Sequence, residues 1–484
     1  GSGAGAEDTT GIEILAFDRA SKRVFAINAG ANSVDVVDLA DPANPTRITV
    51  IDFAPFGGGV NGVAIHDRLV AVASEAVAKT DPGSVVFLDA ATLDVLGQVP
   101  AGALPDMVTF TPDGEYLLVA NEGEPSEDYA IDPEGSVTVI DLRAGVGAAT
   151  ARTAGFAAYV GQESALRERG VRIFGSQRLV QADGTVVRVP SNAAQDFEPE
   201  YIAVQGPRAY VTLQENNAVA VLNIGQARIE SVLPLGFKDH SLTANKFDAS
   251  DRDGPDADGL PPATSRINIA NWPVFGMYQP DAIASFRVGP QQFLVTANEG
   301  DSRSSDDFEG IDEEVRLGAR RVDGQFVYPL DATAFPNAAA LRANGALGRL
   351  NVTKASGDTD GDGDFDQIHV FGARSLSVWT TNGELVWDSG DQLERYFADP
   401  ANGYAAIFNA SNNDVSRDSR SDNKGPEPEG VAVGRISGRT FAFVGLERIG
   451  GVMACDVTDP YAPRFAAYAN TRSLTEVKGD LGAE

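Results

Sequence analysis

Cysteine is almost absent from this chain of 484 residues, whose single copy is Cys455. One cysteine excludes an intramolecular disulfide, a cysteine-ligated zinc site and an iron–sulfur cluster. It lies in the apolar run 452–455, where we expect a small buried side chain and not a nucleophile. Histidine is nearly as scarce, with three copies, so a metal centre would be built mainly from oxygen ligands.

Positive charge is also in short supply. The 38 Lys and Arg residues face 69 Asp and Glu residues, which gives a net charge of -31. Nucleic acids and anionic membrane surfaces would be repelled by such a chain, so neither is an expected partner, whereas metal cations would be attracted. No apolar run reaches the roughly 18 residues of a transmembrane segment. We expect a folded protein that is extracellular, on the cell surface or periplasmic.

Long helical periodicity is almost missing, and short runs rich in Val, Ile, Phe and Tyr recur between turn-forming residues. One element recurs six times: a small residue, then alternating apolar residues, usually closed by Asp or Asn. The copies lie at 33–38, 84–89, 136–141, 218–223, 375–379 and 451–456. Each is followed by a turn and another short strand. The pattern predicts an all-β fold.

A second repeat precedes the first. An acidic or amide residue opens one strand, and the next strand ends near a glutamate. The pairs are Asn61 with Glu75, Asp106 with Glu122, Glu200 with Glu215, Asp281 with Glu299, and Glu429 with Glu447; Glu13 opens a further copy that ends near Asn28. Together the repeats predict six units of four antiparallel strands, which favours a β-propeller over a sandwich or a solenoid. We expect a flexible tail at residues 1–10 and a single propeller domain at 11–484.

The opening and closing residues of these units should meet at one rim of the ring, because the start of a blade's first strand and the end of its second lie at the same edge. Most of the long insertions should cross that rim, where loops on a rigid scaffold often carry function. The insertions lie near 123–134, 143–199, 236–279, 300–369 and 391–428; the strands within 143–199 cannot be placed from the sequence.

A ring of carboxylates repels itself unless cations or basic groups neutralise it, so the repeats predict a metal site. The expected ligands are Asp106, Glu122, Glu200, Asp281, Glu299, Glu427, Glu429 and Glu447. The alternative is that single acids cap strand ends or accept bonds from backbone amides. Oxygen ligands favour Ca²⁺, Mg²⁺ or Mn²⁺. His240 enters the same face and is the candidate catalytic acid or base, whereas His66 and His369 are expected to be structural.

The acidic segment 358–366 is a more specific metal motif. Its carboxylates at loop positions 1, 3, 5 and 9, with Gly363 at position 6, match a calcium loop of the EF-hand type. The acids are Asp358, Asp360, Asp362, Asp364 and Asp366. Position 12 is His369 where an EF-hand has glutamate, and no flanking helices are evident. We expect Ca²⁺ here, rigidifying the insertion, against the alternative of a solvated acidic loop. The stretch 248–258 is a weaker candidate of the same kind.

Basic residues stand among these acids. Arg303, Arg420 and Lys424 are candidates for binding an anionic substrate, since cations next to a metal grip a phosphoryl group. The alternative is that each pairs with a neighbouring carboxylate. No Walker loop, Rossmann fingerprint or GxSxG elbow is present.

Four segments resemble the choice-of-anchor I family. They are 278–284, 296–303, the acidic loop running into 371–375, and 422–430. The resemblance runs over nearly the whole chain and implies an extracytoplasmic, calcium-dependent propeller related to alkaline phosphatase-like and phytase or esterase-like secreted proteins, and to mesenchyme-specific cell-surface glycoproteins. It also implies that a further blade follows, because 479–484 resembles the opening of a first strand. We therefore expect seven blades, the last cut off or supplied by a separate fragment, with six blades as the alternative.

Two functions follow from these residues. The first is a metal-dependent phosphoester hydrolase, with Ca²⁺ and a second divalent or trivalent metal (Mn²⁺, Mg²⁺, Zn²⁺ or Fe³⁺) at the carboxylates and a small phosphoester as substrate. The second is a non-catalytic calcium-binding protein of the cell surface or matrix that contacts a polymer or a mineral. The basic residues between the acids favour the hydrolase.

Overall fold

A computed structural model describes residues 12–126, 128–181, 183–254, 266–303, 312–412, 417–472 and 474. The chain divides into two compact units. The first comprises residues 1–165, 191–213 and 219–232, and the second 166–190, 214–218 and 233–484. The predicted flexible tail at 1–10 and the strand opening at Glu484 lie outside the described residues. No helix in the described part of the chain is both long enough and apolar enough to cross a membrane.

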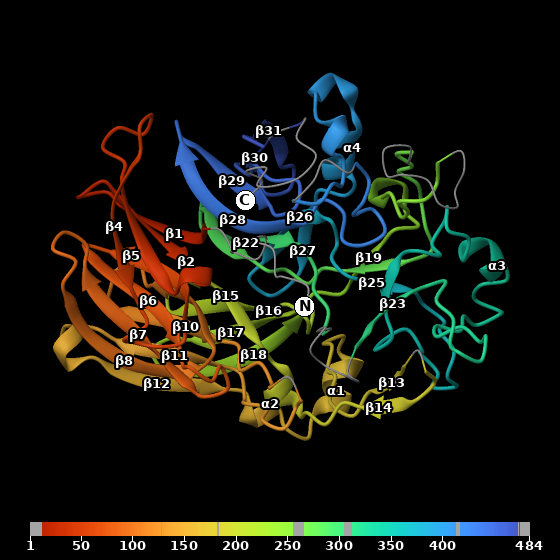
Figure 1. The fold of residues 1–484 in the computed structure, drawn as a ribbon, viewed down its shortest axis with the longest axis horizontal. Helices are drawn as coiled ribbons and strands as arrows, with labels where there is room; N and C mark the ends of the chain where they lie inside the picture. Colours follow the sequence, from red (N-terminus) through yellow and green to blue (C-terminus); the bar gives the residue numbers. More distant parts are fainter. Residues whose placement is uncertain are drawn as a thin grey trace, which may run out of the picture. The chain divides into compact units, whose positions relative to one another are not determined.

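Six four-stranded antiparallel sheets carry the fold (Figure 1). Their strands are β1 (Ile12–Asp18), β2 (Arg23–Asn28), β3 (Ser33–Asp38) and β4 (Thr46–Asp52); β5 (Gly59–His66), β6 (Leu69–Glu75), β7 (Pro82–Asp89) and β8 (Val95–Ala103); β9 (Pro105–Phe110), β10 (Tyr116–Asn121), β11 (Ser136–Asp141) and β12 (Thr150–Gly155); β15 (Pro199–Gln205), β16 (Arg208–Leu213), β17 (Ala218–Asn223) and β18 (Arg228–Pro234); β21 (Ile283–Val288), β22 (Gln291–Asn298), β26 (Ser375–Thr380) and β27 (Leu385–Asp388); and β28 (Pro428–Ile436), β29 (Arg439–Leu446), β30 (Val452–Asp456) and β31 (Arg464–Ala469). The third strands β3, β7, β11, β17, β26 and β30 are the six predicted repeats, so the all-β prediction is confirmed.

The first unit stacks its sheets through their first strands: β1 lies beside β5, β5 beside β9, and β9 and β10 beside β15. Buried apolar side chains of the first two sheets share one core, which contains Phe25, Val36, Val86 and Leu88. The opposite face of the second sheet, with Phe87, packs on the third. Alternation along each strand supplies both faces, because successive side chains point to opposite sides. The short helix α2 (Ala193–Asp196) also belongs to this unit.

The second unit pairs two four-stranded sheets with a compact insertion. Strand β28 packs against β21 and β22. The described segments 236–254, 266–279 and 312–370 belong to the predicted insertions and fold around their own core, which includes Phe247, Tyr328 and Leu350. Two small sheets contribute to that core: β19 (Phe237–Asp239), β20 (Phe275–Met277) and β25 (His369–Val370), and β23 (Glu314–Arg316) with β24 (Asn351–Thr353). The hairpin β13 (Arg178–Val180) and β14 (Val186–Arg188) has a small core of its own, formed by Phe174, Leu179 and Val189.

Helices are few and short. The remaining α-helices are α1 (Glu163–Glu168), α3 (Ala338–Leu341) and α4 (Gln392–Ala398). Single 3-10 turns lie at η1 (Ala29–Ala31), η2 (Val146–Ala148), η3 (Ala157–Tyr159), η4 (Thr243–Asn245), η6 (Pro400–Asn402) and η7 (Ala405–Ile407). Cys455 is buried in β30, as predicted.

A β-bulge marks the start of most first strands, and it holds the predicted opening residue. In β28 the register slips between Pro428 and Val431, so Glu429 and Gly430 face one residue of β29. Equivalent slips enclose Asn61 in β5, Asp106 in β9, Glu200 in β15 and Glu13 in β1. A bulge inserts a residue outside the alternating pattern and re-aims its side chain. The repeat found in the sequence is therefore a repeat of bulges.

Candidate functional site

Three glutamates of the second unit converge at the ends of neighbouring strands. Glu299 directly follows β22, Glu427 directly precedes β28, and Glu447 directly follows β29. One oxygen from each lies within 4.8 Å of the others. Glu427 is fully buried and Glu299 is 8% exposed. The structure therefore brings together three of the predicted metal ligands, which we call the glutamate cluster.

Basic side chains fill the space around the glutamate cluster. Arg420 donates two hydrogen bonds to Glu427, at 2.7 and 3.0 Å. Lys424 donates to Glu299, and its ammonium lies 3.6 Å from Glu427. Arg448 reaches Glu427 at 3.4 Å and Glu447 at 2.8 Å. Three cations thus face three carboxylates, and the predicted substrate-binding residues Arg420 and Lys424 are engaged in ion pairs.

Burial and charge set the pKa values of the cluster. Burial opposes ionisation of Glu427, but Lys424 and Arg420 outweigh it and hold the pKa of Glu427 below its ordinary value. Burial, and then repulsion from Glu299 and Glu427, raise the pKa of Glu447 to about 9. Burial disfavours the charged form of Lys424, but the charges of Glu299 and Glu427 outweigh it and raise the pKa of Lys424 above its ordinary value. The cluster is an electrostatically coupled unit.

The donor set of the cluster fits a hard cation, since three carboxylates offer only oxygen. The ammonium of Lys424, however, already bridges Glu299 and Glu427. A metal ion would compete with Lys424 for these oxygens.

Two glycines place Glu299. A Cβ on Gly300 would lie 2.0 Å from the backbone nitrogen of Gly372, and a Cβ on Gly372 would lie 1.9 Å from the carbonyl oxygen of Glu299. Both residues have positive φ, at 92° and 71°. Only glycine allows the two backbones to approach so closely in this conformation.

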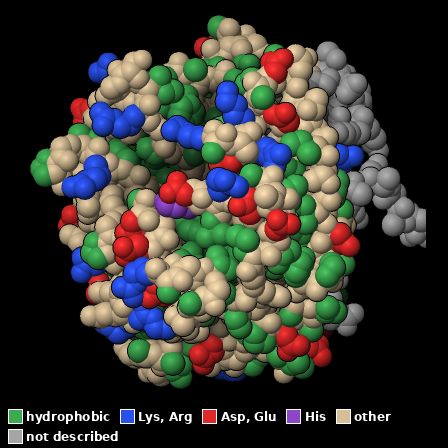
Figure 2. Space-filling model, turned by 90° about the vertical axis from the view of Figure 1, so that its left-hand side faces the viewer, with side chains coloured by type: hydrophobic (Ala, Val, Ile, Leu, Met, Phe, Trp, Pro, Cys, Tyr) green, Lys and Arg blue, Asp and Glu red, His purple; other side chains and the backbone are tan. Residues whose placement is uncertain are grey.

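The other predicted ligands of the repeat lie elsewhere. Asp281 and Glu429 are in the second unit but outside the glutamate cluster, although the charge of Glu429 acts on Glu447. Asp106, Glu122 and Glu200 belong to the first unit. There, Lys79 bonds Glu124 at 2.6 Å and also feels the negative charge of Glu122. Figure 2 shows acidic and basic side chains interspersed on the face that it draws.

His240 is only 2% exposed. Its Nδ1 lies 2.6 Å from the carbonyl oxygen of Asn245, and its ring packs edge-on against Phe247. Burial, and then the charge of Lys238, lower the pKa of His240 well below its ordinary value. These contacts hold the neutral ring in the insertion core, and its catalytic role stays a prediction.

Arg303, the third predicted substrate-binding residue, places its guanidinium 5.0 Å from the ring centre of Phe174. Its backbone amide donates to Glu313 at 2.9 Å. The side chain thus makes a cation–π contact within the second unit.

The predicted calcium loop separates into two groups of acids. Ligand oxygens of Asp358, Asp360 and Asp362 lie within 4.8 Å of one another, and so do those of Asp331, Asp364 and Asp366. The turn is tightened by Gly361 and Gly363, whose amides donate to Asp358 at 2.7 and 3.1 Å. At position 12, the ring of His369 bonds Ser356 and Gln367, each at 3.0 Å.

The described part of the other acidic stretch, 248–254, is already paired. Asp251 accepts from Arg349 at 2.5 Å, and Asp253 lies 3.7 Å from Arg266. Asp248 is fully buried, and burial, then repulsion from Glu394, raise its pKa to about 8. Residues 255–258 lie outside the described part.

Sequence reasoning missed Arg448 and Asp331. Arg448 follows Glu447 directly, so the alternation of charge at the strand end was a usable signal. Asp331 joins the loop because the chain at Leu330 forms a parallel bridge with Phe365. Nothing in the local pattern predicts a bridge across 35 residues.

Comparisons with known proteins agree with the resemblance in the sequence. Mesenchyme-specific cell surface glycoprotein of Strongylocentrotus purpuratus is 28% identical over 286 residues, which are 54% of this chain and 35% of that protein. Gigasin-3a of Magallana gigas is 34% identical over 119 residues, 23% of this chain and 40% of that protein. The matches thus span less than half the length of either relative.

Among solved structures, hydrazine synthase of Kuenenia stuttgartiensis matches with 16% identity and a TM-score of 0.29, covering 60% of this chain and 81% of that one. A family model matches residues 13–460, nearly the whole chain, and its description is the choice-of-anchor I domain. The protein described here belongs to the choice-of-anchor I family.

Proposed function

We propose that the chain is a calcium-binding domain of a protein that works at the cell surface or outside the cell. The observation that carries the proposal is the grouping of Asp358, Asp360 and Asp362 on an exposed, glycine-turned loop. Oxygen-only donors on a loop with alternating Asp and a tight glycine turn are the arrangement that Ca²⁺ prefers.

The loop also needs a cation on electrostatic grounds. Five aspartates lie within nine residues, and Asp331 adds a sixth carboxylate. Burial, then repulsion from Asp362 and Asp331, raise the pKa of Asp364. Bound Ca²⁺ would remove that repulsion and fix the loop against the insertion core, where Phe365 stacks on Tyr328 at 3.6 Å.

Isothermal titration with Ca²⁺ tests the proposal. We expect binding with a Kd of about 10⁻⁴–10⁻³ M, the range of extracellular modules, and a loss of at least about tenfold in the double variant Asp360→Asn/Asp362→Asn. Glu115→Gln removes an exposed acid from the first unit and should bind normally. Equal affinity in the double variant and in Glu115→Gln would contradict the proposal.

The location rests on the relatives. One is named a cell surface glycoprotein, and shared membership in one family extends that location to this chain as a proposal. The partner would then be a surface polymer or mineral, not a nucleic acid. Fractionation of the source cells, with an antibody against the chain, tests the location.

We further propose that the six sheets are blades of one β-propeller. The support is the repeated order of four strands and the packing of successive first strands within each unit. An experimental structure in which these sheets do not close into one ring would contradict the proposal.

A second candidate function is a metal-dependent phosphoester hydrolase centred on the glutamate cluster. The convergence of Glu299, Glu427 and Glu447 favours it. A metal ion bound there would supply an activated water and charge stabilisation. Lys424 and Arg303 would orient the phosphoryl oxygens, which requires Lys424 to leave its glutamates. No step is assigned to His240, because its ring is buried.

Turnover of an aryl phosphate tests the hydrolase. The activity should disappear with a chelator, return with Ca²⁺, Mn²⁺, Mg²⁺, Zn²⁺ or Fe³⁺, and be lost in Glu447→Gln. The variant Glu115→Gln serves as the matched control. If none of these metals supports turnover, the hydrolase is ruled out and calcium binding is the function that remains.

A further inference from the structure

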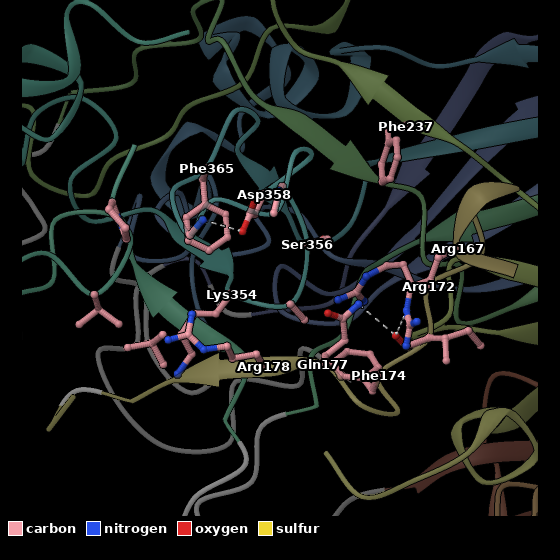
Figure 3. Close-up of a pocket in the computed structure, with 18 of the residues that line it drawn as sticks. Arg167, Arg172, Phe174, Gln177, Arg178, Phe237, Lys354, Ser356, Asp358 and Phe365 are labelled. Atoms are coloured by element: carbon pink, nitrogen blue, oxygen red, sulfur yellow. Dashed lines mark hydrogen bonds between the residues drawn. The ribbon is translucent and has the colours of Figure 1, made fainter. Parts of the chain in front are cut away.

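A cavity of about 540 Å³ in the second unit lies between the hairpin β13–β14 and the acidic loop 358–366 (Figure 3). Its lining is basic, although the chain as a whole is strongly acidic. Among the described residues, four arginines and Lys354 line it, against one carboxylate, that of Asp358. The volume is in the range of small-molecule sites. We call this cavity the basic pocket.

Two of its arginines serve the structure. Arg172 is 7% exposed; it donates to the carbonyl oxygen of Glu215 and to the carboxylate of Glu313, both at 2.6 Å. Arg167 donates to the carbonyl oxygens of Ile173 and Gly175 and so ties the loop before β13. In Figure 3, Arg167 and Arg172 lie on one side of the basic pocket, and Arg178 and Lys354 lie on another.

The other cations keep unused donors. Arg178 is exposed at the start of β13, and no hydrogen bond or ion pair of its guanidinium is found within the described residues. Arg321 pairs with Asp323 at 2.9 Å, but its Nε is buried without an acceptor. Arg178 can therefore donate to a ligand without giving up a carboxylate partner. Arg321 can donate as well, because only one of its nitrogens is paired with Asp323.

Lys354 is 7% exposed, and its ammonium donates to the side-chain oxygen of Gln181 at 3.2 Å. In the described part of the chain no carboxylate lies within ion-pair distance of it. Burial lowers the pKa of Lys354, opposed by the more distant charges of Asp312 and Glu313. A buried ammonium with one neutral acceptor is costly unless an anion joins it.

The hairpin adds an independent argument. Arg178 and Arg188 occupy directly opposite positions of β13 and β14. Like charges at opposite positions of an antiparallel pair destabilise the pair. The chain is rich in acidic residues, yet neither of these two positions carries an acid that would neutralise the other. An anion bound at the hairpin would relieve the repulsion.

Apolar groups supply the rest of the basic pocket. Phe237 is 38% exposed and stacks one face on His369, with ring centres 4.5 Å apart. Phe365, a residue of the acidic loop, lines another part of the wall. A ligand with a flat or ring-shaped body would bury its apolar surface here while its charge meets the cations.

We propose that the basic pocket binds a small organic oxyanion, a phosphoryl, sulfuryl or carboxylate group on a ring-shaped body, with Arg178, Arg321 and Lys354 as its charge-binding residues. The charge-binding residues are separate from the glutamate cluster and need no metal ion. Asp358 of the proposed calcium loop also lines the basic pocket, so the experiment below tests anion binding both with and without Ca²⁺.

Calorimetric titration of the purified chain with phenyl phosphate, phenyl sulfate and benzoate tests the proposal and identifies the preferred oxyanion; phenol is the neutral control. We expect saturable binding of at least one anion and none of phenol. Arg178→Gln should weaken binding by at least about tenfold, the worth of a charge-assisted hydrogen bond. Arg178→Lys should recover part of that loss. Lys354→Met should weaken binding as well.

Arg439→Gln is the matched control, because Arg439 is an exposed arginine of β29 paired with Asp456. Its affinity for the anions should equal that of the unaltered chain. Absence of binding by all three anions, or equal loss in Arg439→Gln and Arg178→Gln, would overturn the proposal. The titrations are run with Ca²⁺ and with a chelator; binding that persists in chelator supports the basic pocket even where the calcium proposal has failed.

Discussion

Glu427 forms ion pairs with three cations, and replacing it by glutamine tests the account of the glutamate cluster. The carboxylate is fully buried and faces Arg420, Lys424 and Arg448. Glutamine keeps the shape and one acceptor oxygen but removes the charge. Three cations would then face Glu299 and Glu447 alone.

The expected cost follows from burial. Removing one partner of a buried ion pair destabilises a protein by about 3–5 kcal/mol. Since glutamine still accepts one hydrogen bond, we expect about 3 kcal/mol for Glu427→Gln, at the lower end of that range. Asp456→Asn breaks a pair whose arginine is 57% exposed, and such surface pairs are worth below about 1 kcal/mol.

Equilibrium urea unfolding, followed by circular dichroism in the presence of a chelator, measures both variants. Hydrogen exchange of 428–446 shows whether the loss is local to β28 and β29. A midpoint shift for Glu427→Gln no larger than that for Asp456→Asn would refute the reasoning. A loss seen only when metal is supplied would make Glu427 a metal ligand instead of an ion-pair partner.

Three further predictions follow from other contacts. Gly372→Ala should lower the free energy of unfolding in urea by at least about 2 kcal/mol, because a Cβ there would clash with the carbonyl oxygen of Glu299 and the residue has positive φ. The control Gly438→Ala should lower it by only about 1 kcal/mol, since Gly438 has a φ of 83° but no atom within 4 Å of the added Cβ. Burial, then the charge of Arg172, lower the pKa of His369 to about 3. The stability contributed by the neutral ring is therefore complete above about pH 6.5 and is lost as the pH falls toward 3. In a pH titration followed by near-ultraviolet circular dichroism, His369→Gln should unfold at lower pH than the unaltered chain, and an unchanged acid sensitivity would contradict this prediction. Burial raises the pKa of the Cys455 thiol to about 11, so a thiol reagent at neutral pH should label it only after denaturation, and rapid labelling of the folded chain would disprove its burial.

The repeats were readable because each obeys one local rule. Alternation of apolar residues predicted the six third strands, such as β3 (Ser33–Asp38) and β11 (Ser136–Asp141), and the opening acids marked the bulges. The strand ends that carry Glu299 and Glu447 were placed correctly for the same reason, whereas the predicted opening residue Glu429 lies two residues after Glu427 of the cluster. The closed ring and its blade number stay predictions.

The insertions could not be read in this way. Strands of two or three residues, such as β25 (His369–Val370), carry no periodicity, and their core depends on contacts between 247 and 370. The basic pocket collects Arg178, Arg321 and Lys354 from three segments far apart in the chain. Only the folded chain shows that they share a wall.

The bulges at the starts of the first strands have a consequence for how the repeats diverge. A residue in a bulge stands outside the two-sided alternation that fills the core, so exchanging it leaves the packing of the sheet unchanged. The same place holds Asn61, Asp106, Glu200 or Glu429 in different sheets. The bulge position therefore accepts amide or acidic side chains of different length. Each sheet can change the ligand chemistry at this position while its interior keeps the same alternating apolar pattern.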